Sequence, residues 1–365
     1  MRTFALCMAF LGCAACPLAQ AAPQHDWQRL EAAAAMAEKE SLEPVLHQKS
    51  VSAAITAYLQ TLDPYSSYIS PAEARQLKED AGNTFGGVGM DIIRNSDGML
   101  YCLPHAGSPA ANAGIGYGDV LRAVDGAFLH DKPLSVVQHL VRGPALSPVR
   151  LLVAGVDGVK EVTVTREMVQ PPSAELVAGQ GFYRIRLTRF DANTLPQLKA
   201  ALARVPAGMP LVLDVRGNVG GDLEAALQSA SLFLPPGTPL VTIVKKDALP
   251  DVQLSGGGGT EPAGLVAVWQ DAFTASAAEV FAAALAHNGK AVLVGQRSFG
   301  KGRSQVAVPA KDGGIYLITN AELLPPNGIS YHGKGLEPDL LVGSRSATVQ
   351  ADFERRTYEA LGKTH

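Results

Sequence analysis

Cysteine is scarce in this chain of 365 residues, and its few positions exclude two kinds of site. The cysteines are Cys7, Cys13, Cys16 and Cys102, and the first three fall in a segment with the pattern of a cleavable export signal. A mature chain that keeps Cys102 alone has no intrachain disulfide and no cysteine metal cluster. Cys102 lies in the apolar run 99–103, which favours a buried strand cysteine over a nucleophile.

Charge is also sparse. Charged residues make up 18% of the chain, and the net charge is −3. The absence of a long basic run argues against a nucleic-acid partner. The histidines show no HExxH pattern or other close spacing typical of a metal site, so we expect neither a metal nor a cofactor. The apolar content of 47% is enough for a sizeable core.

The N-terminal apolar stretch, residues 4–18, is too short to span a membrane comfortably. It follows Arg2 and precedes Ala19-Gln20-Ala21, in the order of a charged region, an apolar region and a small-x-small cleavage site. We therefore expect residues 1–21 to be a signal peptide and the mature protein to be exported and periplasmic. A secreted or a lipid-anchored protein is the alternative, because Leu11-Gly12-Cys13 is a partial lipobox.

Two segments with different patterns precede the rest of the chain. Alanine-rich, helically spaced apolar residues predict an N-terminal helical segment over residues 22–81, interrupted at Pro64. A unit over residues 82–168 opens with Gly86-Gly87-Val88-Gly89. Strand patterns follow at 90–93, 149–154 and 161–165, with a short helix at 133–142.

Residues 169–345 alternate between strand and helix patterns, which predicts an α/β core. The expected strands are 182–187, 211–215, 265–269 and 291–294, and the expected helices are 195–202, 223–233 and 277–287. We expect residues 346–365 to be a C-terminal tail. The stretch 295–301 partly matches the sequence motif of a phosphate-binding loop. Gly302, however, stands in place of the magnesium-ligating Ser or Thr, and a strand pattern follows instead of a helix, which argues against nucleotide binding.

Ser276 and Lys301 are the strongest candidates for chemistry. Ser276 directly precedes an alanine-rich helical run, and Lys301 lies in Ser298-Phe299-Gly300-Lys301-Gly302. Serine is a poor nucleophile until a base takes its proton, and a lysine kept neutral can be that base. A lysine with its ordinary pKa of about 10.4 is protonated at neutral pH, so it needs a pocket that penalises the charge.

A series of motifs, in this order and spacing, resembles the carboxy-terminal processing proteases, also called tail-specific proteases, of the Ser/Lys serine peptidases. Between the second and third motif, residues 82–168 resemble a PDZ domain. The motifs are Leu62-Asp63-Pro64-Tyr65-Ser66-Ser67-Tyr68, Phe85-Gly86-Gly87-Val88-Gly89, Leu213-Asp214-Val215-Arg216-Gly217-Asn218-Val219-Gly220-Gly221, Thr274-Ala275-Ser276-Ala277-Ala278-Glu279, Ser298-Phe299-Gly300-Lys301-Gly302 with Gln305, and Gly335-Leu336-Glu337-Pro338-Asp339.

The resemblance implies an α/β protease core of ClpP/crotonase-like β-α units, an inserted PDZ domain of mainly β structure, and an N-terminal helical segment. It also implies that Ser276 is the nucleophile, Lys301 the general base and Gln305 the residue that orients the lysine. The backbone amide of Ala277, with that of Gly220 or Gly221, would form the oxyanion hole.

The implied activity is that of an exported serine endopeptidase that recognises protein C-terminal tails. Its partners would be proteins or peptides with apolar C-termini, whose terminal carboxylate the amides of Gly86, Gly87, Val88 and Gly89 would hold. Two alternatives stay open: a catalytically silent peptide-binding module, and a protease that depends on an activator or adaptor. The helical residues 26–61 could then form an adaptor surface or a homo-oligomer interface.

Overall fold

The computed structural model describes residues 24–42, 47–80, 86–95, 97–130, 132–168, 172–177, 181–258, 266–343 and 349–362. The predicted signal peptide lies outside these residues. The chain divides into two compact units, Met1–Val51 and Ser52–His365. Helix α1 (Gln24–Glu40) belongs to the first unit, and helix α2 (His47–Gln60) spans the boundary. No helix among the described residues is long and apolar enough to cross a membrane.

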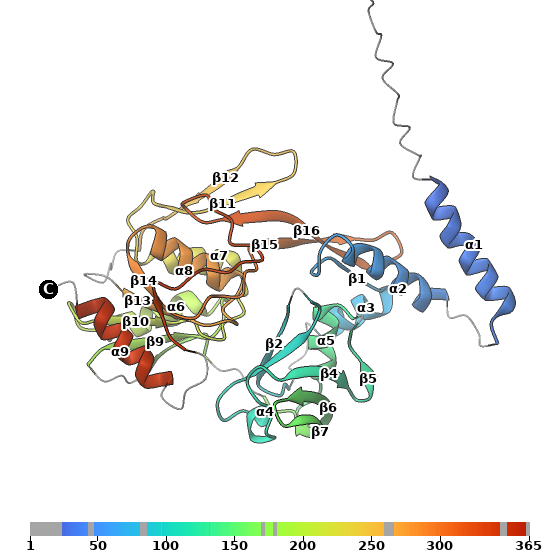
Figure 1. Ribbon diagram of the computed structural model, residues 1–365, viewed down its shortest axis with the longest axis horizontal. Coiled ribbons are helices and arrows are strands. Elements are labelled where there is room, and N and C mark those ends of the chain that lie inside the picture. Colours follow the sequence, from blue (N-terminus) through green and yellow to red (C-terminus); the bar gives the residue numbers. More distant parts are fainter. Residues whose placement is uncertain are drawn as a thin grey trace, which may run out of the picture. The chain divides into compact units, whose positions relative to one another are not determined.

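Within the second unit, the described residues form three sheets, one of which is the centre of the α/β core (Figure 1). Its strand order is β17-β14-β13-β10-β9-β8, and every neighbouring pair is parallel except β8 with β9. Every residue of β10 and β13 is buried, as expected for strands covered on both faces. The strands are β8 (Ala174–Val177), β9 (Tyr183–Leu187), β10 (Leu211–Asp214), β13 (Val266–Gln270), β14 (Ala291–Gly295) and β17 (Leu340–Leu341).

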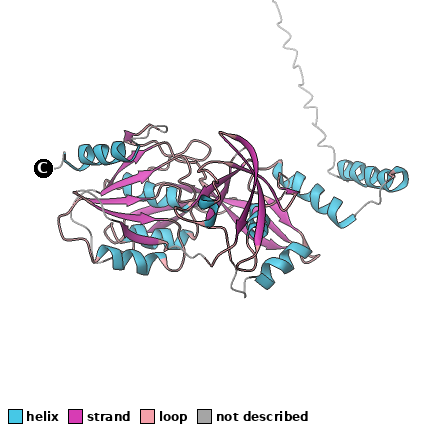
Figure 2. Cartoon of the chain, turned by 90° about the horizontal axis from the view of Figure 1, so that it is seen from below, coloured by secondary structure: helices cyan, strands magenta, loops and turns pink. Residues whose placement is uncertain are grey.

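Helices cover both faces of this central sheet, as the cyan helices beside the magenta strands of Figure 2 show. Helices α6 (Thr194–Leu202), α7 (Leu223–Ser231) and α8 (Ala277–His287) share one apolar cluster with it. Helix α9 (Val349–Gly362) packs on the opposite face through Phe353, Ala360 and Leu361. The expectation of a C-terminal tail over 346–365 is therefore wrong for residues 349–362, because their apolar side chains complete the core.

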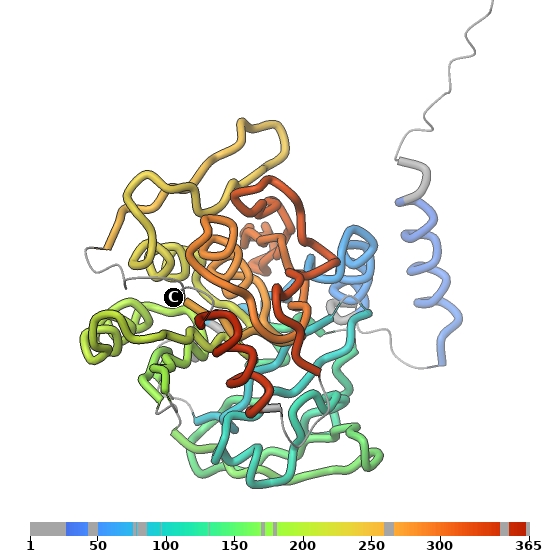
Figure 3. Tube along the Cα trace, turned by 60° about the vertical axis from the view of Figure 1, so that its left-hand side comes forward, coloured from blue at the N-terminus to red at the C-terminus, as the bar shows by residue number. Residues whose placement is uncertain are grey.

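The second sheet joins distant parts of the sequence. Its strand order is β1-β16-β11-β12, and β15 also pairs with β16. Figure 3 shows the blue N-terminal residues of this unit beside the orange-red strands, and Ser67 pairs with Leu317. The segment expected to be helical over 22–81 thus also supplies a strand, followed by α3 (Pro71–Asp80). The strands are β1 (Ser67–Ile69), β11 (Pro239–Lys245), β12 (Asp251–Leu254), β15 (Arg303–Pro309) and β16 (Ile315–Leu324).

The third sheet lies within residues 86–168 and has an apolar cluster of its own. Its strands are antiparallel in the order β2-β3-β4-β6-β7, with β5 paired to β4, and helix α5 contacts β2. The elements are β2 (Met90–Arg94), β3 (Leu100–Pro104), α4 (Pro109–Asn112), β4 (Val120–Val124), β5 (Ala127–Phe128), α5 (Leu134–Val141), β6 (Pro148–Gly155) and β7 (Gly158–Thr165).

Candidate active site

Ser276 stands at the N-terminus of α8 in a strained backbone conformation. Its φ is 58° and its ψ is −123°, in the positive-φ region that non-glycine residues rarely adopt. Such a conformation costs on the order of 1–3 kcal/mol and persists only where the surroundings enforce it. Here the preceding residues are fixed by backbone bonds from Ala275 N to Asn218 O and from Phe299 N to Thr274 O.

Glu279 ties the Ser276 turn to the Lys301 loop. The side chain is fully buried, and one carboxylate oxygen, Oε2, accepts from both the Ser276 and the Lys301 amide, at 2.9 and 2.8 Å. The other oxygen accepts from Ser298 Oγ and Gly300 N. Because one oxygen holds both amides, the backbones of Ser276 and Lys301 lie within two hydrogen-bond lengths of each other.

Sequence reasoning did not single out Glu279. A signal was available, because a serine followed three positions later by glutamate is the spacing of a capping box at a helix start. At the start of an alanine-rich run, the same spacing is also typical of an ordinary capped helix. Burial raises the pKa of the Glu279 carboxyl to about 7, although the bonds from Ser298, Gly300, Ser276 and Lys301 oppose that rise.

Lys301 places its amine in a sheltered position. Gly300 before it has a φ of 91°, and a Cβ there would lie 2.8 Å from Gly335 N, so only glycine fits this tight approach. The Lys301 Nζ lies 4.9 Å from the centre of the Tyr65 ring. Burial lowers the pKa of the Lys301 amine, while the charges of Glu279 and Asp63 act in the opposite direction.

Gln305 is on β15, directly opposite Thr319 on β16. Its Nε2 donates to Thr319 Oγ1 at 3.1 Å. Among the described residues, no hydrogen bond joins Gln305 to Lys301. Gln305 therefore lies on β15, the strand that begins two residues after Lys301. The amide nitrogen of Gln305 donates to Thr319.

The two glycines expected at the oxyanion hole differ in what their amides do. A Cβ on Gly220 would lie 2.9 Å from Ser276 Cβ and 3.0 Å from Ala277 N, so this backbone closely approaches the serine. The Gly220 amide, however, donates to Asn218 Oδ1 at 2.9 Å. Within the described chain, the amides of Ala277 and Gly221 enter no hydrogen bond. Of the three amides expected at the oxyanion hole, those of Ala277 and Gly221 are therefore the two that no described group accepts from.

In the glycine loop at 86–89, two of the four amides expected to bind a carboxylate are already hydrogen-bonded. Gly86 N donates to Gly143 O and Gly87 N donates to Glu167 O, both at 2.8 Å. These two amides are therefore occupied by backbone pairing, contrary to the expectation that all four would face a ligand. The amides of Val88 and Gly89 make no such backbone bond within the described residues, and Gly89 has a φ of 67°.

The sheet of residues 86–168 packs directly on the loops around Ser276. Ile93 and Leu103 share an apolar cluster with Ala275, and Phe273 stacks against both Tyr101 and Tyr117. Tyr117 also donates its hydroxyl proton to Asp271 Oδ2 at 2.7 Å. The β sheet and the residues before the serine are thus one continuous packed region.

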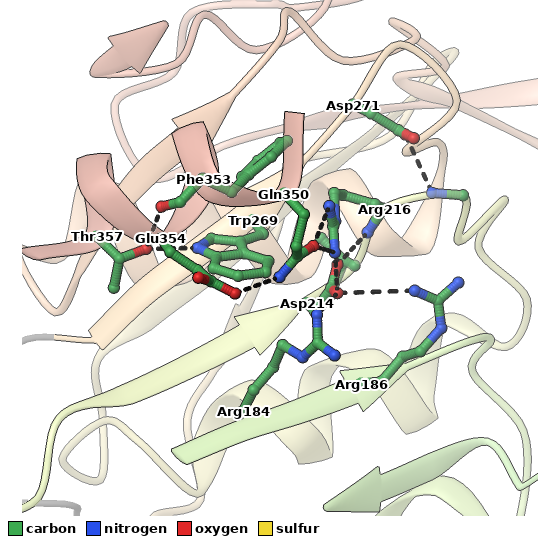
Figure 4. A network of polar contacts seen from close by, with 12 residues as sticks. Arg184, Arg186, Asp214, Arg216, Trp269, Asp271, Gln350, Phe353, Glu354 and Thr357 are labelled. Carbon is green, nitrogen blue, oxygen red and sulfur yellow. Dashed lines mark hydrogen bonds and ion pairs between the residues drawn. The ribbon is translucent and has the colours of Figure 1, made fainter. Parts of the chain in front are cut away.

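A charge cluster surrounds the buried carboxylate of Asp214, at the end of β10 (Figure 4). Arg216 binds Asp214 with two bonds, of 2.8 and 2.6 Å, and the guanidinium groups of Arg184 and Arg186 lie 3.6 Å from the same carboxylate. The Arg216 guanidinium also stacks on Trp269 at 4.7 Å from the ring centre. Residues of α9 close the cluster, since Gln350 accepts from Arg216 and Thr357 accepts from Trp269 Nε1.

Comparisons with known proteins agree with this arrangement. Residues 183–342 match the model of peptidase family S41. The chain is 32% identical to a "Probable CtpA-like serine protease" of Staphylococcus haemolyticus, over 80% of this chain and 60% of that protein. It is 30% identical to the carboxy-terminal-processing protease of Bartonella bacilliformis, over 81% of this chain and 70% of that one. The chain therefore spans less than two thirds of the staphylococcal relative.

A solved structure, that of a photosystem II D1 C-terminal processing protease, superposes on the chain with a TM-score of 0.72. The identity is 26%, and the match covers 92% of this chain and 91% of that one. The stretch that matches the family model, residues 183–342, contains Ser276, Glu279 and Lys301. The chain belongs to peptidase family S41, among the carboxy-terminal processing proteases.

Proposed function

We propose that the chain is an exported serine endopeptidase that binds protein C-terminal tails and hydrolyses peptide bonds with Ser276 and Lys301. One observation carries the proposal. Ser276, held in a strained turn, and Lys301, whose amine is desolvated, are tied to the same oxygen of Glu279. Such an arrangement suits a nucleophile and a base that must keep a fixed geometry.

In this mechanism the neutral Lys301 amine accepts the proton of Ser276 Oγ as that oxygen attacks the scissile carbonyl carbon. The amides of Ala277 and Gly221 stabilise the resulting oxyanion, each contributing on the order of 3 kcal/mol. The Lys301 ammonium then gives its proton to the leaving amine. Water, activated by the same lysine, attacks the acyl-enzyme and releases the new C-terminus with Ser276 restored.

Residues 82–168 are the substrate-binding part of the proposal, as a PDZ domain. A tail with an apolar C-terminus would add to the sheet beside β2 and α5. Its carboxylate would accept from the amides of Val88 and Gly89, which backbone pairing does not use. The signal-like residues 1–21 support export to the periplasm. The proposed partners are therefore exported proteins with flexible apolar tails.

The test is turnover of an unstructured protein with an apolar C-terminal tail, followed by mass spectrometry. We expect Ser276→Ala and Lys301→Ala each to lower kcat by at least about 10³-fold, because the two residues act as a unit. Both variants should still bind the tail peptide. The wild-type rate should rise with pH along a limb below the ordinary lysine pKa, since burial lowers the pKa of Lys301.

Lys246→Ala is the matched control, because Lys246 is exposed on the turn after β11. It should cleave at the wild-type rate. Turnover by Ser276→Ala equal to that of the wild type would sink the nucleophile assignment. Activity retained by Lys301→Ala alone would mean that another group takes the serine proton.

A further inference from the structure

A hydrogen-bond chain runs from Gln305 to a carboxylate in the N-terminal part of the second unit. Gln305 Nε2 donates to Thr319 Oγ1 at 3.1 Å, and Thr319 Oγ1 donates to Asp63 Oδ1 at 3.0 Å. Asp63 is separated from Thr319 by 256 positions in the sequence. The pairing of β1 with β16 brings these distant residues together.

The charge of Asp63 determines which group donates and which accepts in each of these hydrogen bonds. Asp63 is held as a carboxylate, because bonds from Ser66, Tyr65 and Thr319 outweigh burial and keep its pKa below the ordinary value. A carboxylate only accepts, so the single hydroxyl proton of Thr319 goes to Asp63. The Thr319 oxygen can then only accept from Gln305. The Gln305 amide must therefore present its NH₂ group to Thr319 and leave its carbonyl oxygen, Oε1, as the free end.

The turn that holds Asp63 is itself well anchored. Its Oδ1 accepts from the amides of Tyr65 and Ser66, each at 2.8 Å, and Oδ2 accepts from Ser66 Oγ at 2.7 Å. Ser66 Oγ in turn accepts from Thr319 N at 3.1 Å. Thr319 is thus held through both its backbone and its side chain, which leaves it little freedom to rotate.

The same turn also contacts the lysine. Tyr65, two residues after Asp63, presents its ring to the Lys301 Nζ, and the Asp63 charge acts on that amine. One short segment, residues 63–66, therefore contacts the lysine directly and is linked to the glutamine through Thr319. None of its side chains takes part in the proposed proton transfers.

We propose that Asp63 and Thr319 are positioning residues that orient the Gln305 amide, so that Oε1 is the end available to the Lys301 amine. This inference rests on the proposed function of the Ser276–Lys301 pair. The neutral amide can accept from the amine without adding a negative charge beside it. A carboxylate at the glutamine position would favour the ammonium and raise the lysine pKa. The Thr319 hydroxyl lies between Asp63 and Gln305. Asp63 therefore orients the amide through Thr319, without a direct contact between the Asp63 carboxylate and Gln305.

The experiment compares the full chain with Thr319→Val, Thr319→Ser and Asp63→Asn. Thr242→Val is the matched control, because it makes the same change on β11, which pairs with β16. Two readouts are taken on each protein. The first is the side-chain amide signal of Gln305 in NMR spectra of protein labelled with ¹⁵N-glutamine, assigned with Gln305→Glu. The second is kcat and KM for tail-peptide cleavage across pH.

Thr319→Val should change the Gln305 amide signal and lower kcat about tenfold with KM unchanged, the effect expected for about 1.4 kcal/mol. Thr319→Ser, which keeps the hydroxyl, should restore the signal and most of the rate. Asp63→Asn keeps an oxygen that accepts from Thr319 but removes the charge. Because the Asp63 charge raises the pKa of Lys301, the rising limb of the pH–rate profile should lie at lower pH in Asp63→Asn than in the wild type. Thr242→Val should resemble the wild type in both readouts.

An unchanged Gln305 signal in Thr319→Val would overturn the inference, whatever the cleavage rates. A changed signal with wild-type kcat, or equal losses in Thr319→Ser and Thr319→Val, would overturn the positioning role. If Thr319→Val does not fold, Asp63→Ala takes its place: it removes the acceptor of the Thr319 hydroxyl proton, and an unchanged Gln305 signal then contradicts the inference. If the wild type cleaves no peptide, the proposed protease function fails, and the amide orientation is judged from the Gln305 signals alone.

Discussion

Asp214 and Glu279 are both fully buried carboxylates, yet the structure satisfies them in different ways. Asp214 faces guanidinium groups, with Arg216 bound through two bonds and Arg184 and Arg186 nearby (Figure 4). Glu279 is bound by a hydroxyl and three backbone amides, all neutral. Within the described residues, no arginine pairs with Glu279.

The difference sets the two pKa values in opposite directions. Burial alone would raise the pKa of Asp214, but the bond and charge of Arg216, with Arg186 and Arg184, hold it below the ordinary value. For Glu279 burial prevails, and its pKa rises to about 7. A carboxylate fixed by cations is suited to holding strands and α9 together. Under the proposed mechanism, a carboxylate that is partly protonated near neutral pH places less negative charge beside Lys301 than a permanently ionised one would.

The largest expected effect comes from removing the charge of Asp214. Asp214→Asn keeps the shape but leaves the arginine cluster without its buried anion. Breaking a buried pair in this way costs about 3–5 kcal/mol of unfolding free energy. Urea unfolding, followed by circular dichroism, measures the loss. The expected drop would identify Asp214 as a structural carboxylate.

Arg186→Gln is the control for this prediction. Its side chain is 37% exposed and lies 3.6 Å from Asp214 without a close bond, so the expected loss is at most about 1 kcal/mol. The free energy of unfolding of Asp214→Asn could instead lie within about 1 kcal/mol of the wild-type value, or both variants could lose the same amount. Either result would show that the cluster does not stabilise the fold in the way its geometry indicates.

The second prediction concerns the pH dependence of stability. Glu279 has a folded pKa above its unfolded value of 4.5, so its contribution is fully present below pH 4.5 and is lost as pH rises through about 7. Asp214 has a lowered folded pKa, so its contribution is present above about pH 4 and is lost at lower pH. Between pH 4.5 and 8, the Glu279 contribution should fall by about 3 kcal/mol.

Urea unfolding of the wild type and Glu279→Gln at several pH values in this window separates the two carboxylates. The stability difference between the proteins should change with pH, because only the wild type can ionise at this position. Glu224→Gln, an exposed change in the first turn of α7, should leave the pH dependence as it is in the wild type. A constant difference between wild type and Glu279→Gln would show that the pKa of Glu279 is not raised by folding.

The sequence was sufficient for elements whose signals are local. Strands β10 and β13 are short apolar runs, and α7 and α8 have helical spacing, so the α/β alternation was predicted with small errors at the ends. Strands β11, β12 and β16 were not predicted. Strands β11 and β16 depend on pairing between distant segments, β12 depends on its pairing with β11, and β16 alternates only weakly between buried and exposed residues.

The site divides in the same way. Ser276 and Lys301 lie in short motifs whose chemistry is legible from neighbouring residues. The contacts of Asp63 with Thr319 and of Gln350 with Arg216 join residues that are 256 and 134 positions apart in the sequence, so no local pattern predicts them. The use of the Gly86, Gly87 and Gly220 amides was equally hidden, because a glycine-rich loop does not tell which of its amides are already bonded.

The smallest expected effect tests the contact between residues 86–168 and the residues before Ser276. Asp271 accepts from Tyr117 through Oδ2, while Oδ1 accepts from Gly217 N and Phe273 N. Tyr117→Phe removes only the hydroxyl bond and keeps the ring contact with Phe273, so it should cost about 1 kcal/mol. Urea unfolding measures this loss.

Tyr101→Phe is the matched control for that change. Tyr101 lies on β3 and also contacts Phe273, at 5.7 Å between ring centres, but the described structure gives its hydroxyl no hydrogen bond. We expect Tyr101→Phe to cost less than about 0.5 kcal/mol. Equal losses in the two variants would mean that ring packing, not the bond to Asp271, joins the β sheet to the residues before Ser276. A loss confined to Tyr117→Phe would assign Asp271 to the structural side of the comparison, with Asp214 and apart from Glu279.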